Sequence, residues 1–178
     1  MIDRILRAIR LDPNVYREIA EDENALSEAA IIVIVVTFLS ALGSAFVADN
    51  FIVGLLVGWL TAIVVGWILW AVLTYFVGAN LFGGRSSIPE MLRVLGYASA
   101  PQLLGLFGFI PCLGWLAALI GAILSLIAGV IAVRESMEFD TGKAVLTVLI
   151  AWVISFAITF AIGLLIGGGA AAFGALSG

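Results

Sequence analysis

The chain has 178 residues, of which 63% are hydrophobic and 11% are charged, and its mean hydropathy is +1.24. Because a soluble domain carries about a quarter charged residues, this composition excludes an ordinary soluble domain and indicates an integral membrane protein. The net charge is −4, histidine is absent and Cys112 is the only cysteine. The chain alone therefore cannot build a zinc site, a Ser-His or Cys-His catalytic pair, or a disulfide framework.

Residues 1–24 are predicted to be a cytoplasmic segment that begins with an amphipathic helix. At 100° per residue, four apolar side chains share one face of that helix: Ile2, Ile5, Leu6 and Ile9. Three basic side chains lie opposite or on the flank, where we expect them to meet anionic lipid headgroups at the membrane surface: Arg4, Arg7 and Arg10. A second short helix should begin after Asp12, with Pro13 as its first residue. Two interpretations stay open: an interfacial helix that only orients the first span, or a docking surface for a cytoplasmic-side protein.

Two acidic clusters border the apolar part of the chain. The first runs from Glu18 to Glu28 and the second from Glu135 to Asp140. Runs of like charge are usually solvated, so the first cluster is predicted to be a solvated linker. The second could hold a cation through its three carboxylates, but it lacks an ordered calcium-loop pattern and is expected to be a solvated loop. We therefore expect no metal site and no cofactor.

Four uncharged stretches are long enough to cross a bilayer, which takes about 20 helical residues: residues 29–48, 50–84, 94–133 and 144–178. The third is long enough to cross twice, with Pro111 and Gly114 at the turn of a helical hairpin. The sequence thus predicts an all-α polytopic membrane protein with five transmembrane helices, near residues 26–47, 51–77, 90–110, 112–133 and 143–167. The membrane domain covers residues 25–167, and residues 168–178 should form a small-residue tail.

The basic residues predict the orientation, because Lys and Arg near span ends are retained on the cytoplasmic side. Every basic residue falls before the first span, between the second and third, or between the fourth and fifth: Arg4, Arg7, Arg10, Arg17, Arg85, Arg93, Arg134 and Lys143. All of these segments lie on one side of a five-span protein. The N-terminus is therefore expected in the cytoplasm and the C-terminus outside.

Small residues recur at four-residue spacing in two of the predicted spans. The second span contains Gly54, Gly58, Ala62 and Gly66, and the fourth contains Ala117, Gly121, Ser125 and Gly129. Such spacing lets helix backbones approach closely inside a membrane. The two ladders predict either packing within one bundle or the contact face of a homo-oligomer, because a single small-residue motif does not distinguish them.

The third predicted span carries the candidate polar kink site. A capping box from Ser87 to Glu90 should start its helix at Ile88. Pro101 removes a backbone N–H and frees the carbonyl of Tyr97 near the middle of the bilayer. The site comprises Tyr97, Ser99, Pro101 and Gln102. It is either a polar pocket that faces the bundle interior or a break that neighbouring groups repair locally.

Arg93 to Pro101 carries a V-L-G-Y-x-x-x-P segment. This segment resembles the one at the third span of the Yip domain family, membrane proteins that interact with Rab GTPases. Four other segments resemble the prokaryotic branch: Leu11 to Ile19, Gly83 to Leu92, Ile110 to Gly114 and Arg134 to Ala144. The resemblance covers roughly residues 3–166 and implies five spans, a cytoplasmic N-terminus and a prokaryotic cell membrane. Eukaryotic relatives act in early secretory-pathway traffic, bind Rab GTPases and associate with one another.

The predicted function is a non-enzymatic membrane adaptor or membrane-organising protein, in membrane trafficking or homeostasis, that self-associates or binds a cytoplasmic-side partner. The alternative is a channel or facilitator for a small neutral solute, with the Pro101 kink along its path. No ionisable residue lies well within a predicted span, which disfavours proton-coupled carriers and intramembrane proteases. We expect no catalytic residues and no nucleic-acid partner.

Overall fold

The computed structural model describes residues 1–46, 49–109 and 114–177, and helices account for most of them, with no strand in these ranges. The predicted all-α fold is therefore confirmed. The predicted hairpin turn at Pro111 lies outside the described residues.

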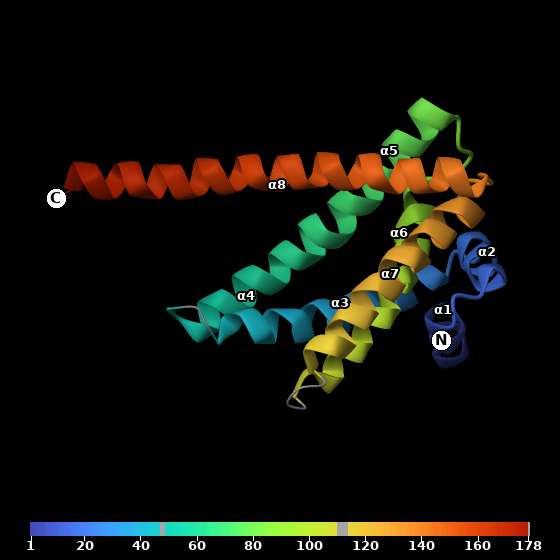
Figure 1. Cartoon of the computed structure of the whole chain (residues 1–178), viewed down its shortest axis with the longest axis horizontal. Helices are drawn as coiled ribbons and strands as arrows, with labels where there is room; N and C mark the ends of the chain where they lie inside the picture. The colour runs from blue at the N-terminus through green and yellow to red at the C-terminus, as the bar shows by residue number, and fades with distance from the viewer. Residues whose placement is uncertain (47–48, 110–113, 178) are drawn as a thin grey trace.

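The helices follow one another with short connections. In chain order they are α1 (Ile2–Ile9), α2 (Pro13–Glu21), α3 (Ala25–Ala45), α4 (Phe51–Thr61), η1 (Ala62–Leu69), α5 (Trp70–Phe82), α6 (Ile88–Ala98), η2 (Ala100–Phe109), α7 (Gly114–Ser136) and α8 (Thr141–Ser177). The segment η1 is a π-helix, and η2 is a 3-10 helix. Figure 1 shows that α4 runs through η1 into α5 as one rod.

Local signals in the sequence set two helix starts. The Asp12 side chain accepts a hydrogen bond from Asn14 N at 3.0 Å, as an N-cap residue does. At the start of α6, Glu90 N donates to Ser87 Oγ at 3.3 Å, and Ser87 N donates to Glu90 Oε2 at 3.2 Å. The capping box is therefore confirmed, and α6 begins at Ile88 as predicted.

Four of the described helices are long and apolar enough to cross a membrane: Ala25–Leu42, Phe51–Phe82, Leu116–Ser136 and Thr141–Ala161. They correspond to the first, second, fourth and fifth predicted spans. The third predicted span, residues 90–110, is divided between α6 with 11 residues and η2 with 10. Because a crossing takes about 20 helical residues, neither segment alone is long enough.

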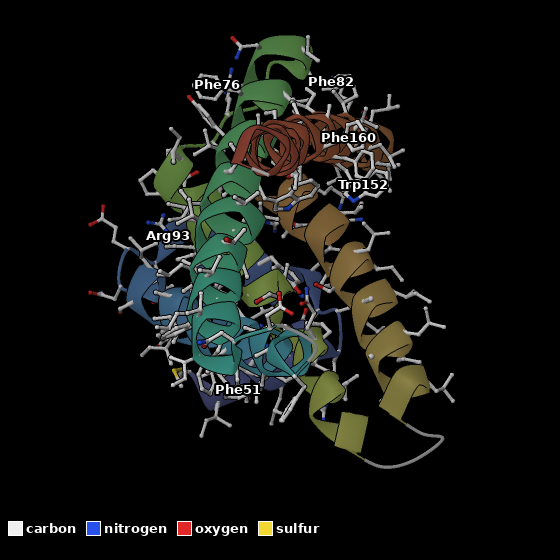
Figure 2. All side chains as sticks on the ribbon, turned by 90° about the vertical axis from the view of Figure 1, so that its left-hand side faces the viewer. Phe51, Phe76, Phe82, Arg93, Trp152 and Phe160 are labelled. Atoms are coloured by element: carbon white, nitrogen blue, oxygen red, sulfur yellow. The ribbon has the colours of Figure 1, made fainter. Side chains whose placement is uncertain are left out.

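Large apolar side chains cover the outer faces of α4, α5 and α8. On α8, the rings of Trp152, Phe156 and Phe160 stack along one face with centroids 6.0 and 6.3 Å apart, and each side chain is more than half exposed. Figure 2 shows Trp152 and Phe160 on the outer side of this helix. Soluble proteins rarely expose a contiguous apolar surface of this kind, so the chain is an integral membrane protein.

One end of the molecule gathers the N-terminal helices, the end of α7 and the start of α8 (Figure 1). There α2 packs against α6 and α7, and Tyr16, Ile19, Met91 and Val133 are fully buried in a shared core. Most charged residues of the chain lie in these helices and in the loops next to them, so we call this region the charged end. The N-terminal segment is therefore part of the folded core and not an appendage to it.

The last helix, α8, has 37 residues, which corresponds to a length of about 55 Å. It continues through residues 168–177, where the sequence predicts a tail. Figure 1 shows that α8 crosses the α4–α5 rod near its start and then leaves the other helices.

Candidate functional site

The polar kink of the third predicted span lies where α6 changes into η2. α6 ends at Ala98, and Ser99 Oγ donates a hydrogen bond to Gly96 O at 2.7 Å. Pro101 has no N–H to donate and lies in the first turn of η2, where Gln102 N donates to Ser99 O at 2.9 Å in the 3-10 pattern. The chain therefore changes its helical winding next to the proline.

A serine of α7 supplies a hydrogen-bond partner to this break. Ser125 Oγ donates to Ala98 O at 2.7 Å, and Gln102 Nε2 donates to Ser125 Oγ at 3.1 Å. An unpaired carbonyl inside a bilayer costs several kcal/mol, so this contact stabilises the break. The sequence predicts Ser125 only as a small residue of a packing ladder, and the structure gives its hydroxyl a second role.

A cavity of about 510 Å³ lies beside the break, between α3, η1, α6, α7 and α8. Its polar lining consists of hydroxyl groups and one amide: Thr37, Ser40, Ser99, Gln102, Ser125 and Ser155. The remaining lining is mostly apolar and includes Trp67, Trp70 and Trp152. Among the described residues that line it, none is ionisable, so the cavity suits a neutral molecule or a lipid tail and offers no general acid or base.

Tyr97 and Pro101 lie outside this lining. Tyr97 is fully buried, and its hydroxyl donates a hydrogen bond to Glu28 Oε2 of α3. Pro101 is also buried, and a Cβ placed on Gly121 of α7 would lie 2.9 Å from its carbonyl oxygen. The structure thus brings Ser99 and Gln102 together at the cavity, whereas Tyr97 hydrogen-bonds to α3 and Pro101 packs against α7.

Tyr97 belongs to an ionic cluster that fixes the N-terminal helices, which we call the hairpin latch. It consists of Arg4, Arg7, Asp12, Glu18, Asp22, Glu28 and Tyr97. Arg4 is its centre: Nη1 lies 2.7 Å from Asp22 Oδ2 and 3.5 Å from Glu28 Oε2, and Nε lies 2.8 Å from Glu18 Oε1. The latch joins α1 to α2 and to the first turn of α3.

Arg7 closes the same hairpin from the other side. Its Nε lies 3.0 Å from Asp12 Oδ2, and its Nη1 lies 2.9 Å from Glu18 Oε2. Beneath these pairs, the buried Tyr16 hydroxyl donates to Ala8 O at 3.2 Å. Charge pairing and a buried hydrogen bond therefore both hold α1 against α2.

The pairs change the proton affinity of their members. Hydrogen bonds from Arg4 lower the pKa of the Asp22 carboxyl, and hydrogen bonds from Arg4 and Arg7 lower that of Glu18. The same bonds, to Asp22 first and then Glu18, raise the pKa of Arg4. At neutral pH all three groups are therefore charged and the latch is closed.

The latch differs from what the sequence predicts for these charges. The expected solvated linker is instead the acidic partner of α1, because the turn at residues 10–12 folds α1 back onto α2. Arg4 and Arg7 bind carboxylates of the chain itself. Arg10 is exposed and has no ion-pair partner among the residues that the structure describes, so it alone of the three arginines is free for a headgroup.

The small-residue ladders have mixed surroundings. Gly121 lies against the Pro101 carbonyl, whereas nothing described lies within 4 Å of a Cβ placed on Gly66 or Gly129. Both of these glycines border the cavity. Gly54, Gly58, Ala62 and Ala117 are half-buried on α4, η1 and α7.

A closer helix contact lies outside the ladders. A Cβ on Gly96 of α6 would lie 2.7 Å from Ala29 Cβ of α3, so these two helices touch at their smallest side chains. Four-residue spacing within one helix does not reveal this pair, because its two residues belong to different helices. The sequence feature that points to this contact is the position of Gly96 within the V-L-G-Y segment.

Comparison with known families and proteins gives one match. Residues 8–163 match the Yip1 domain, a range that includes α2 to α7, the kink cavity and the latch carboxylates Asp12, Glu18, Asp22 and Glu28. No curated protein and no solved structure matches the chain. Since the match covers most of the 178 residues, the chain belongs to the Yip1 domain family.

Proposed function

We propose that this protein is a non-enzymatic membrane adaptor that binds a cytoplasmic-side protein through its N-terminal helical hairpin. The observation that carries the proposal is the hairpin latch, which holds α1 in a fixed orientation on the membrane domain. The apolar side chains of Ile2 and Leu6 remain 71% and 50% exposed, next to the exposed Arg10. A preordered helix with an exposed apolar face loses little entropy when it binds a partner.

The proposal includes a topology. In it, the α6–η2 segment is the third of five crossings, with its break stabilised by Ser125. Five crossings put the two termini on opposite sides, and we propose the N-terminus in the cytoplasm and the C-terminus outside a prokaryotic cell membrane. The charged end would then face the cytoplasm, as the distribution of Lys and Arg favours. Self-association through the half-buried Gly54 and Gly58 face is part of the same proposal and would serve membrane trafficking or homeostasis.

Site-specific photo-crosslinking in the native membrane tests the adaptor proposal. A photoreactive residue at Leu6 should yield discrete protein adducts. The matched control is Leu119 of α7, which is 47% exposed on the apolar surface and should yield only lipid adducts or none. If Leu6 also reacts only with lipid, α1 rests on the membrane surface and the adaptor proposal is wrong.

The kink cavity supports a second candidate, a facilitator for a small neutral solute. Its volume of about 510 Å³ and its hydroxyl and amide lining suit such a molecule. Glycerol flux into liposomes that contain the purified protein tests it, with Gln102→Leu as the cavity variant and Phe160→Leu as the lipid-facing control. The facilitator is favoured if the flux exceeds that of empty liposomes and if Gln102→Leu, but not Phe160→Leu, reduces it. Flux equal to that of empty liposomes would contradict the facilitator and leave the adaptor as the proposed function.

A further inference from the structure

Arg93 of α6 is a buried cation without a matching anion. Its side chain is 6% exposed, and its Nη2 donates to Ala20 O at 2.6 Å. Its Nε has no hydrogen-bond partner, and no carboxylate forms an ion pair with it within the described ranges. Figure 2 labels Arg93 on the opposite side of the view from Trp152 and Phe160.

The surroundings of Arg93 compensate its charge only in part. Ala20 lies in the last turn of α2, where the helix dipole carries a partial negative charge. A full anion is missing, and a buried unpaired charge is strongly destabilising. We therefore expect the free N–H donor of this buried guanidinium to bind an anionic group of a ligand.

Arg93 borders a polar cavity of about 630 Å³ at the charged end. Three more arginines line it: Arg17, Arg85 and Arg134. Arg17 and Arg134 both pair with Glu135, at 2.5 and 2.8 Å. Arg85 is exposed and forms no ion pair in the part of the chain that the structure describes. Two guanidinium groups of this cavity, Arg85 and Arg93, are thus available to a phosphate.

The same cavity also has free negative charge. Glu90 is engaged by Ser86 Oγ and Ser87 N, and Glu135 by its two arginines. Glu21, Glu23 and Glu138 are exposed, line the cavity and have no ion-pair partner among described residues. A purely anionic ligand would meet these three carboxylates unfavourably. A ligand with one phosphate and one ammonium group can pair with the free arginines and also with the free glutamates.

The position of Arg93 suits a lipid headgroup. Arg93 is five residues after Ile88, the first residue of α6, which is at most about 7.5 Å along the helix axis. The headgroup layer is roughly 5–7 Å thick on each side of the hydrocarbon core. With Ile88 at the aqueous edge of this layer, in the topology proposed above, the guanidinium lies within reach of the lipid phosphates.

We propose that this cavity binds a phosphate ester that carries a primary ammonium group, the headgroup chemistry of phosphatidylethanolamine. Arg93 and Arg85 donate hydrogen bonds to the phosphate oxygens. Glu21, Glu23 and Glu138 accept hydrogen bonds from the ammonium group at the mouth of the cavity. The proposal rests on the topology proposed above but does not depend on the adaptor role.

Thermal-shift titration of the full chain in detergent tests the ligand class, with phosphatidylethanolamine, phosphatidylcholine and phosphatidylglycerol as probes. The apparent affinity for phosphatidylethanolamine should be at least tenfold higher than for the other two, because the trimethylammonium group cannot donate hydrogen bonds and phosphatidylglycerol has no cation. Equal affinities for all three lipids, or a preference for phosphatidylglycerol or phosphatidylcholine, would overturn the proposal.

Two variants test the residues. Arg93→Gln keeps an amide donor near Ala20 O but removes the charge, and Arg85→Gln changes an exposed side chain that the fold does not use. Each should weaken the apparent affinity at least tenfold, whereas the control Lys143→Gln, which changes an exposed cation outside the lining of the cavity, should stay within twofold. If Arg93→Gln does not fold by circular dichroism and gel filtration, Arg85→Gln carries the test. Parent-like affinity in every folded variant would overturn the proposal.

Free headgroups distinguish the source of the phosphate. Soluble phosphoethanolamine should bind at least 100-fold more weakly than the lipid if the ligand comes from the membrane. Affinity equal to that of the lipid would support the ligand class and overturn its membrane source. If inorganic phosphate protects as well as phosphoethanolamine, the role of the glutamates is wrong.

Discussion

The Tyr97 hydroxyl of α6 donates a hydrogen bond to the Glu28 carboxylate of α3, and that carboxylate lies 3.5 Å from Arg4 of α1. One carboxylate of α3 therefore joins α6 to the N-terminal hairpin. Tyr97 comes from the segment predicted as a polar kink, but its side chain extends to the hairpin latch and not to the cavity.

Tyr97→Phe removes this hydrogen bond and keeps the ring. Because hydrogen bonds to charged groups contribute about 1.5–3 kcal/mol, the variant should lower the free energy of unfolding by that amount. Thermal or denaturant unfolding in detergent measures it. Tyr75→Phe is the control, since Tyr75 is half-buried and its hydroxyl makes no hydrogen bond with described residues; its effect should stay within about 0.5 kcal/mol.

Acid should open the hairpin latch. The pKa values of Glu18 and Asp22 are lowered from 4.5 and 3.8 in the folded protein by hydrogen bonds from arginines. A lowered folded-state pKa stabilises the fold above the unfolded pKa, and this contribution is lost as the pH falls through the folded value. Hydrogen exchange of the α1 amides should therefore be slow at pH 6 and faster below about pH 4.

An arginine variant provides the control for this pH dependence. Arg4→Gln removes the central cation, so α1 should exchange faster at pH 6 and should respond less to acid. A parent protein whose α1 exchange, corrected for intrinsic rates, is unchanged between pH 6 and pH 3 would show that the ion pairs do not hold the hairpin.

Gly96→Val should destabilise the contact between α3 and α6. The first added carbon would lie 2.7 Å from Ala29 Cβ, and overpacking of this kind costs about 1–3 kcal/mol. Gly66→Ala is the matched control, because the described residues leave the space around its Cβ open; it should be neutral or slightly stabilising, since alanine favours helix over glycine. Unfolding in detergent compares them, and equal stabilities would place the close contact elsewhere.

Ser125→Ala should leave the Ala98 carbonyl without its partner. Removing one partner of a buried hydrogen bond costs about 1–3 kcal/mol. Ser155→Ala changes another serine of the same cavity whose hydroxyl makes no hydrogen bond within the described ranges, and it should have little effect. If both variants unfold like the parent, trapped water and not Ser125 satisfies the break.

Cysteine labelling tests the orientation in a Cys112→Ser background. Asp49 and Glu138 are both exposed, and they lie at opposite ends of the predicted spans. A membrane-impermeant thiol reagent added outside intact cells should label Asp49→Cys and spare Glu138→Cys, because the basic residues lie on the side of Glu138. The reverse pattern would invert the proposed topology.

Local signals in the sequence predicted the features that depend on neighbouring residues. The Ser87–Glu90 capping box and the Asp12 cap involve groups two or three residues apart, and hydropathy alone predicts four of the crossings. The sequence also predicted a break at Pro101, because proline removes a backbone donor wherever it stands.

These local signals do not predict contacts between residues that are far apart in the sequence. Arginines on an amphipathic helix fit a lipid surface as well as a carboxylate, so the pattern around Arg4 could not distinguish phosphates from Asp22. Tyr97 and Glu28 are 69 residues apart, and only the packing of α3 against α6 brings them together. The same packing determines that Gly96 meets Ala29.

The docked hairpin also imposes an order on biosynthesis. Tyr16 and Ile19 leave the ribosome well before Val133 of α7, which belongs to the core that buries them. At roughly 5–20 residues per second, translation from Tyr16 to Val133 takes on the order of 10 s, during which the core around these side chains is incomplete. The α2 segment is therefore made well before its core is complete, and during the delay its apolar face needs a temporary host, for which the membrane surface or a chaperone is suited.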